Sequence, residues 1–239
     1  MDTFFSHTIG IEFTEWGVYH FIPISLIIVG VLLIYYFRNE IRDSKNEKYF
    51  RYTLGTIGIV AEVSLQIWKL STGNYVLDDL PIGVCSFSLF MSIYVMFTKS
   101  FKVYEIAYFW AIGGVLSILF PDILYGPDRY RYYEYVIGHT SFFFMIMYML
   151  FVHDFIPTFN SFKKSFVLLL AVVLVFIIPV NNIFGTNFMY LLEPGDTPFG
   201  IFWGNGYFLY LVGCIVLSMI VLYIWYLPIV LYRKYKKTT

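Results

Sequence analysis

Two residues with complementary chemistry lie inside apolar stretches of this chain. Cys85 and His139 each fall four residues into a predicted membrane helix, at 81–98 and 135–154. Both helices are predicted to start on the same side of the membrane, so both side chains should lie about 6 Å deep at roughly 1.5 Å per residue. A thiolate beside an imidazole is an activated nucleophile with its own proton carrier. The ordinary interpretation is a space-filling cysteine and a histidine that hydrogen-bonds a neighbouring helix.

Polar residues that could support this pair lie nearby in the predicted topology. The outer half of the helix predicted at 165–190 carries three amides, Asn181, Asn182 and Asn187. Asn181 and Asn187 are candidates to orient His139 or to stabilise a developing oxyanion, and Asp122 could hold His139 in one tautomer. Alternatively, the amides satisfy carbonyls freed by Pro179, and Asp122 is a solvated helix end.

A polar seam is predicted on the helix at 52–72. Its members are Glu62, Gln66 and Lys69, whose spacing of four and then three residues places them on one helical face. Ionisable groups within a span need a partner, a cavity or a function. The seam, together with Asn182, either lines a cavity open to the outside or joins helices through internal hydrogen bonds.

These elements belong to a predicted all-α, seven-helix membrane bundle. Of the 239 residues, 59% are apolar and 13% are charged, well below the roughly 25% charge of soluble domains. We predict helices at 17–37, 52–72, 81–98, 103–125, 135–154, 165–190 and 206–231. Because seven spans of about 20 residues use nearly the whole chain, residues 1–239 should form a single membrane domain.

The basic residues predict the orientation of the bundle. Thirteen of the 16 lysines and arginines fall in four clusters at every second connection, within 38–51, 99–102, 163–164 and 233–237. Short basic loops remain in the cytoplasm, so the N-terminus should lie outside and the C-terminus inside. The expected location is the cytoplasmic membrane, which the chain would cross several times.

Several other function classes find no support in the sequence. It contains no Gly-rich phosphate loop, no H-E-x-x-H and no G-x-S-x-G motif. The histidines are not spaced as metal ligands, so neither a metal nor another cofactor is expected. The basic clusters suit topology and lipid head groups rather than nucleic acid. The two cysteines should be free thiols, and the oligomeric state stays open.

Three segments resemble the YwaF-like family of bacterial integral membrane proteins. They are 80–85 (LPIGVC), 105–115 (EIAYFWAIGGV) with Pro121 and Asp122, and 181–191 (NNIFGTNFMYL), together with the segment around His139. This family is distantly similar to an animal transmembrane phospholipid acyltransferase and to androgen-induced fatty-acid-ester hydrolases. The resemblance implies a lipid enzyme with Cys85 and His139 as the catalytic pair. Gly83 stands where the bacterial pattern often has a histidine.

The sequence thus predicts a membrane-embedded lipid acyltransferase or lipid ester hydrolase. Cys85 would attack the acyl ester of a phospholipid or another acyl lipid, while His139 serves first as base and then as acid. The alternative is a non-enzymatic lipid or small-molecule binding protein or permease that uses the same outer polar cavity. A scaffold for other membrane proteins is a third possibility, in which neither residue matters.

Overall fold

The structure is a computed structural model that describes residues 4–71, 73, 75–195 and 197–238. The regular elements of the described residues are all helices, and these residues contain no β-strand beyond one isolated antiparallel bridge between Glu12 and Tyr125. The all-α class predicted from composition is therefore confirmed.

The helices follow one another with short connections. In chain order they are α1 (Val18–Tyr36), α2 (Arg38–Asp43), α3 (Glu47–Leu70), η1 (Leu77–Asp79), α4 (Val84–Thr98), α5 (Phe101–Trp110), α6 (Ile112–Leu119), α7 (Tyr130–Val152), α8 (Phe159–Ala171), the π-helix η2 (Val172–Ile177), α9 (Ile178–Phe184), η3 (Phe188–Tyr190), η4 (Pro198–Asn205) and α10 (Tyr207–Thr238).

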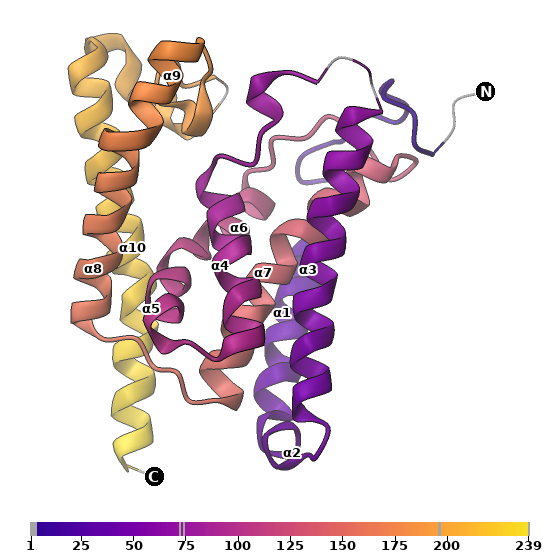
Figure 1. Ribbon diagram of the computed structural model, residues 1–239, viewed down its shortest axis with the longest axis vertical. Coiled ribbons are helices and arrows are strands. Elements are labelled where there is room, and N and C mark those ends of the chain that lie inside the picture. Colours follow the sequence, from indigo (N-terminus) through magenta and orange to yellow (C-terminus); the bar gives the residue numbers. More distant parts are fainter. Residues whose placement is uncertain (1–3, 72, 74, 196, 239) are drawn as a thin grey trace.

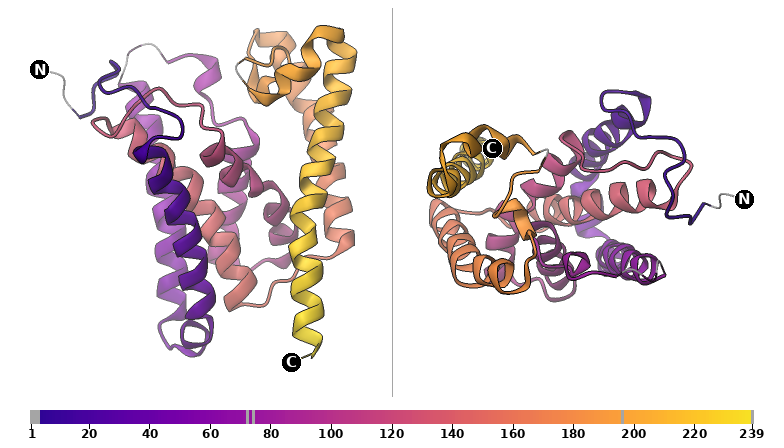
Figure 2. Two further views of the ribbon diagram at one scale, coloured as in Figure 1. Left: turned by 180° about the vertical axis from the view of Figure 1, so that it is seen from behind. Right: turned by 90° about the horizontal axis from the view of Figure 1, so that it is seen from above.

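The bundle has a central helix and a separate flanking pair. α7 packs against α1, α3, α4 and α6, and most of its residues are buried. On the opposite side, α8, η2 and α9 form one continuous rod that stands beside α10 (Figures 1 and 2). The shorter helices α4, α5 and α6 lie between this pair and α7. The chain passes from the central part to the flanking pair after α7, at the lower end of Figure 1, and the segment before α10 joins α9 to α10 at the upper end.

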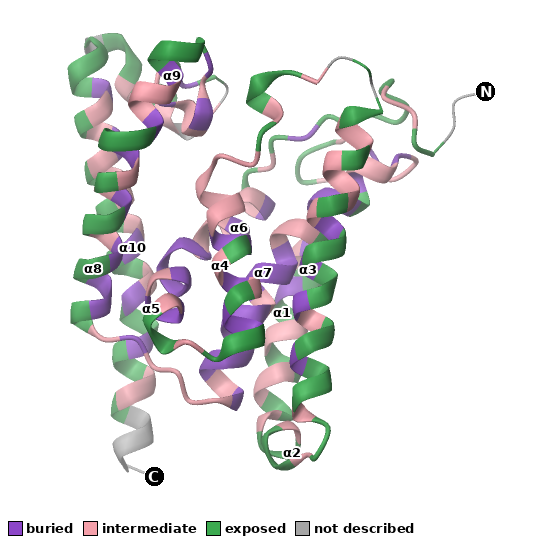
Figure 3. Ribbon diagram, viewed as in Figure 1, coloured by how far each residue is buried: buried purple, intermediate pink, exposed green. Residues whose placement is uncertain are grey.

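The outward faces carry the apolar side chains expected of a membrane protein. Large hydrophobic residues such as Val18, Val175 and Phe208 are exposed, whereas buried residues concentrate around α7 (Figure 3). Six segments of the described chain are long and apolar enough to cross a membrane. They are Val18–Tyr36, Leu77–Thr98, Phe101–Leu119, Tyr130–Val152, Phe159–Phe184 and Tyr207–Lys234. Although α3 has 24 residues, its charged residues leave it outside this set.

Two predicted helices are interrupted in the structure. The helix predicted at 103–125 is broken at Ala111 and ends at Leu119, so Pro121 lies beyond the helix rather than within it. The helix predicted at 165–190 starts earlier, at Phe159, and contains a π-helical segment directly before Pro179. Proline has no N–H for the carbonyl four residues earlier, and a π-helical turn is one way to accommodate that loss.

The carboxylate of Glu47 joins several helices near the start of α3. Glu47 accepts hydrogen bonds from His153 Nε2 at 2.7 Å, Arg51 Nε at 3.0 Å, Tyr148 OH at 3.1 Å and Lys99 Nζ at 3.3 Å. Burial alone would raise the pKa of Glu47, but the His153 hydrogen bond and the nearby cations lower it to about 2. Burial lowers the pKa of His153, so at neutral pH its Nε2–H donates to the carboxylate. Glu47 thus joins α3 to α7 and to the α4–α5 connection.

Candidate functional site

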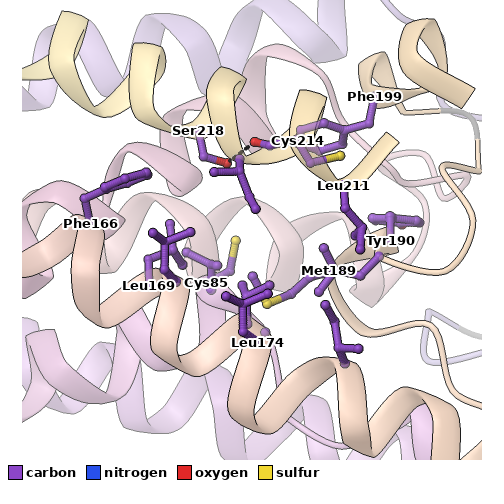
Figure 4. A pocket seen from close by; sticks show the side chains of 17 residues that line it. Cys85, Phe166, Leu169, Leu174, Met189, Tyr190, Phe199, Leu211, Cys214 and Ser218 are labelled. Carbon is purple, nitrogen blue, oxygen red and sulfur yellow. Dashed lines mark hydrogen bonds between the residues drawn. The ribbon is translucent and has the colours of Figure 1, made fainter. Parts of the chain in front are cut away.

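The thiol of Cys85 lies in the wall of an apolar cavity of about 380 Å³. The cavity is enclosed by the first turn of α4 on one side and by α8, η2 and α10 on the other. Figure 4 shows Phe166 at one end and Tyr190 at the other, with Cys85 between them. Its lining is Gly83, Val84, Cys85, Phe166, Leu169, Leu170, Val173, Leu174, Ile178, Met189, Tyr190, Leu191, Phe199, Leu211, Cys214, Ile215 and Ser218. Such a space suits a hydrocarbon chain.

The structure places Cys85 and His139 at different distances from the starts of their helices. Cys85 is the second residue of α4, because that helix begins at Val84 rather than at 81. His139 is the tenth residue of α7, because that helix begins at Tyr130, five residues earlier than predicted. The equal-depth argument therefore does not hold. Within the described chain no hydrogen bond joins the two side chains, and the catalytic pair stays a prediction.

Adjacent glycines of α6 separate the two candidates. A methyl group on Gly113 would lie 3.5 Å from the Cys85 sulfur, and one on Gly114 would lie 2.5 Å from the His139 carbonyl oxygen. Nδ1 of His139 hydrogen-bonds to the Tyr135 carbonyl oxygen at 2.8 Å. In the Nδ1–H tautomer, this bond leaves Nε2 as the proton acceptor of the ring. The ring then has its proton acceptor at Nε2, and the backbone of α6 at Gly113 and Gly114 lies between His139 and Cys85.

Ser117 is the hydrogen-bond partner of the thiol. Its Oγ lies 3.6 Å from Cys85 Sγ, and its carbonyl oxygen accepts a 2.8 Å hydrogen bond from Tyr135 OH. Pro121 explains this geometry, since a helix residue at that position would otherwise donate its N–H to the Ser117 carbonyl. Tyr135 supplies the missing donor from α7. The end of α6, and Ser117 with it, is therefore fixed by a neighbouring helix.

The next carbonyl of α6 is satisfied in the same way. His20, fully buried in α1, hydrogen-bonds through Nε2 to Ile118 O at 2.8 Å. Its Nδ1 accepts the backbone N–H of Trp16 at 2.9 Å, so the proton of the neutral ring is on Nε2. Donors from α1 and α7 thus replace the last helical hydrogen bonds of α6.

A strained segment forms one end of the cavity. The cap segment, residues 185–192, contains Met189 and Tyr190, which adopt left-handed backbone conformations with φ of 62° and 55°. Non-glycine residues reach this region at an energetic cost that surrounding contacts must offset. Asn181 supplies such contacts: its Nδ2 donates to Phe188 O at 3.0 Å, and its Oδ1 accepts Phe188 N and Thr186 Oγ1, each at 2.9 Å.

Tyr190 connects the cap segment to the rest of the site. Its hydroxyl donates to the Asp122 carboxylate, and its carbonyl accepts from the hydroxyl of Tyr210. The backbone N–H of Asp122 in turn donates to Tyr135 OH at 3.3 Å. A chain of contacts therefore runs from the end of the cavity through Asp122 and Tyr135 to Ser117. Tyr135, Tyr190 and Ser117 were not among the predicted site residues, although the four-residue spacing of Ser117 and Pro121 indicates a free carbonyl at Ser117.

The other predicted supporting residues have structural partners. Asn187 accepts Leu192 N at 2.9 Å through Oδ1 and donates to Glu193 O at 2.9 Å through Nδ2, which holds the cap segment in its turn. Asn182 is exposed and donates to Ile178 O within its own helix. In the structure both amides therefore serve the local backbone.

The predicted seam on α3 forms its own network. Glu62 accepts Gln66 Nε2 at 2.8 Å, Gln66 Oε1 accepts Tyr75 OH at 2.9 Å, and Lys69 pairs with Asp79 at 3.3 Å. None of these residues lines the cavity beside Cys85. These hydrogen bonds and this ion pair join α3 to the connection between α3 and α4.

A further buried carboxylate, Glu105, lies on α5. It accepts Ser161 Oγ at 2.7 Å and Lys164 Nζ at 2.6 Å. These bonds join α5 to the first turn of α8 and so help to position the flanking pair. Among the described residues, no group of three or more His, Cys, Asp or Glu side chains could hold a metal ion.

Apolar helices with an internal polar site define a polytopic membrane protein. The TMEM164 family model matches residues 15–226, and the chain accordingly belongs to the TMEM164 family. The narrower YwaF-like assignment finds no support in this match. No curated protein matches the chain, and no solved structure does.

Proposed function

We propose that this protein is a membrane-embedded lipid acyltransferase or lipid ester hydrolase that forms an acyl thioester on Cys85. The position of the thiol carries the proposal: it lies in a long apolar cavity whose far end carries hydrogen-bonding groups. An acyl chain can occupy the apolar part while the polar part of the lipid lies towards Tyr190 and Asp122. Membership in a transmembrane family supports the membrane setting.

The proposed reaction has two balanced steps. First, His139 Nε2 takes the thiol proton, the sulfur bonds to the ester carbonyl carbon, and the ester C–O bond breaks. The departing lysolipid oxygen takes the proton from the imidazolium. Second, a lipid hydroxyl or water gives its proton to His139 and attacks the thioester, whereupon the C–S bond breaks and the sulfur regains a proton. The acceptor distinguishes acyl transfer from hydrolysis.

This mechanism requires His139 to approach Cys85 past Gly113 and Gly114. The glycine pair supports such an approach, because it brings the backbone of α6 close to the Cys85 sulfur on one side and to the His139 backbone on the other. Catalytic hydrogen bonds are often long before substrate binds and tighten in the complex. The proposal therefore includes a shift of the imidazole, or of α6, when lipid enters.

We further propose seven crossings within one membrane domain, with the N-terminus outside a bacterial cytoplasmic membrane. The seventh crossing would be α3, whose 24 residues extend about 36 Å against a hydrocarbon core of roughly 30 Å. α3 packs against α4 and α7, and the two ends of the chain lie at opposite ends of the molecule, as an odd number of crossings requires (Figure 1). The basic connection between α1 and α3 supports a cytoplasmic lower end.

The test compares cells that express the wild type, Cys85→Ala, His139→Ala and Cys214→Ala at equal levels. Cys214 is a matched control because its thiol lines the same cavity. We expect chain-resolved lipid analysis to show an altered acyl profile in the first two variants only. Mass spectrometry of the wild type should detect a hydroxylamine-sensitive acyl adduct on Cys85. Identical acyl profiles in all four strains, without an adduct, would remove the enzyme assignment.

The same strains separate this function from transport or passive lipid binding. A permease or binding protein would retain saturable uptake or lipid binding in Cys85→Ser, whereas the thioester mechanism loses turnover when the sulfur is replaced by oxygen. A scaffold would tolerate both the Cys85 and the His139 substitutions.

A further inference from the structure

The contact between Ser117 and Cys85 has a chemical consequence. Ser117 Oγ is 3.6 Å from the sulfur, and Gly113, one turn earlier on α6, brings the backbone close to the same atom. One face of α6 therefore lies against the thiol, with a hydroxyl as its polar group. The remainder of the surroundings is largely hydrocarbon, which stabilises a sulfur anion poorly.

The hydroxyl is held in place from outside its own helix. Tyr135 OH donates to the carbonyl of Ser117, where Pro121 leaves no backbone donor. Loss of that bond would allow the last turn of α6 to relax and move the hydroxyl away from the sulfur. The two side chains thus act in series, with Ser117 at the sulfur and Tyr135 behind it.

We propose that Ser117 is a catalytic residue that donates a hydrogen bond to the Cys85 thiolate, and that Tyr135 is its positioning residue. The proposal rests on the proposed function in taking Cys85 as the nucleophile. A hydrogen bond to a charged acceptor is about twice as strong as one between neutral groups, so the bond favours the thiolate over the thiol. When the sulfur becomes acylated, its charge is lost and the bond weakens. Ser117 thereby stabilises the thiolate form of Cys85, which is the form that attacks the ester.

Alkylation of the thiol tests this assignment without any lipid substrate. All variants carry Cys214→Ser, which leaves Cys85 as the one cysteine of a chain that has two. The protein is kept in dodecyl maltoside micelles, which contain no acyl ester, and the rate of modification is measured with N-ethylmaleimide and with the smaller methyl methanethiosulfonate. Ser218→Ala is the matched control, because Ser218 lines the same cavity but donates to Cys214 O within its own helix.

We expect Ser117→Ala to slow both reagents about tenfold, since only the thiolate reacts. Ser117→Thr keeps the hydroxyl and should restore the rate to within about twofold, and Tyr135→Phe should slow it about threefold. The control should react like its parent. Equal rates in Ser117→Ala and the parent would overturn the proposal. A slowing that differs strongly between the two reagents would overturn it as well, because it would reflect a change in the accessibility of the thiol. Because no acyl lipid is involved, this result is independent of whether the lipid assay detects turnover.

Discussion

Asn181→Ala should loosen the cap segment far more than its position at the end of a short helix indicates. The side chain is fully buried, and it makes three hydrogen bonds, two with the backbone of Phe188 and one with the hydroxyl of Thr186. Alanine would leave all three groups without these partners. At about 1 kcal/mol for each bond, the free energy of opening the segment should fall by about 3 kcal/mol. This corresponds to an increase of roughly 100-fold in the opening equilibrium.

The strain in the segment adds to this sensitivity. Met189 and Tyr190 hold left-handed conformations that cost of order 1 kcal/mol or more each, and opening releases that energy. Hydrogen exchange of peptides that cover 185–192, in nanodiscs, measures the opening directly. Asn182→Ala is the control, because this neighbouring amide is exposed and bonds only within its own helix. Equal exchange of the segment in the two variants would refute the assignment of Asn181 as its main support.

Three further predictions concern the parts that position the site. Glu47→Gln should destabilise the protein at pH 7. Because folding lowers the pKa of Glu47 from 4.5 to about 2, the wild type should keep its full excess stability over the variant above pH 4.5 and lose it towards pH 2. Unfolding at a series of pH values measures this difference. Gly114→Ala, whose methyl group would meet α7 at 2.5 Å, should lower the free energy of unfolding by about 1–3 kcal/mol, whereas Gly83→Ala, which meets nothing within 4 Å, should have little effect. Tyr135→Phe should lower the free energy of unfolding by about 1 kcal/mol in the wild type. The loss should be smaller in a Pro121→Ala background, where the restored N–H can reach the carbonyl of Ser117. Equal losses in a double-mutant cycle would contradict the role given to the proline.

The sequence predicted the helices better than their ends. Apolar length alone located the segments that became α1, α4, α7 and α10, because burial of the backbone in lipid requires helices. The first and last residues of a helix depend on local hydrogen-bond donors and acceptors, and the predictions were wrong at these positions. α7 starts five residues early at Tyr130, which changed the apparent depth of His139. A shift of this size is within the ordinary error of boundary prediction, and it means that distance from a predicted helix start does not measure the depth of a side chain.

The candidate site was predictable in its residue types and less so in its contacts. Cys85 lies beside an apolar cavity of about 380 Å³, and its role as a nucleophile stays a prediction. The partners of its thiol depend on how α6 ends, and that ending depends on Pro121 together with Tyr135 from another helix. Spacing along one helix carries no information about donors that arrive from a second helix. Similarly, the roles of Asn181 and Asn187 became clear only with the turn they support.

The contacts that end α6 stabilise the fold and also position residues of the candidate site. Pro121 stops the helix and leaves the Ser117 carbonyl to be satisfied by Tyr135, whose hydroxyl also accepts the N–H of Asp122. The carboxylate of Asp122 is in turn the acceptor for Tyr190 at the end of the cavity. A movement of the cap segment that breaks the Tyr190 bond therefore frees Asp122 and changes the surroundings of the tyrosine that fixes Ser117. If the proposed function holds, four contiguous contacts would couple lipid entry beside Tyr190 to thiolate formation at Cys85, because each residue between them has two partners.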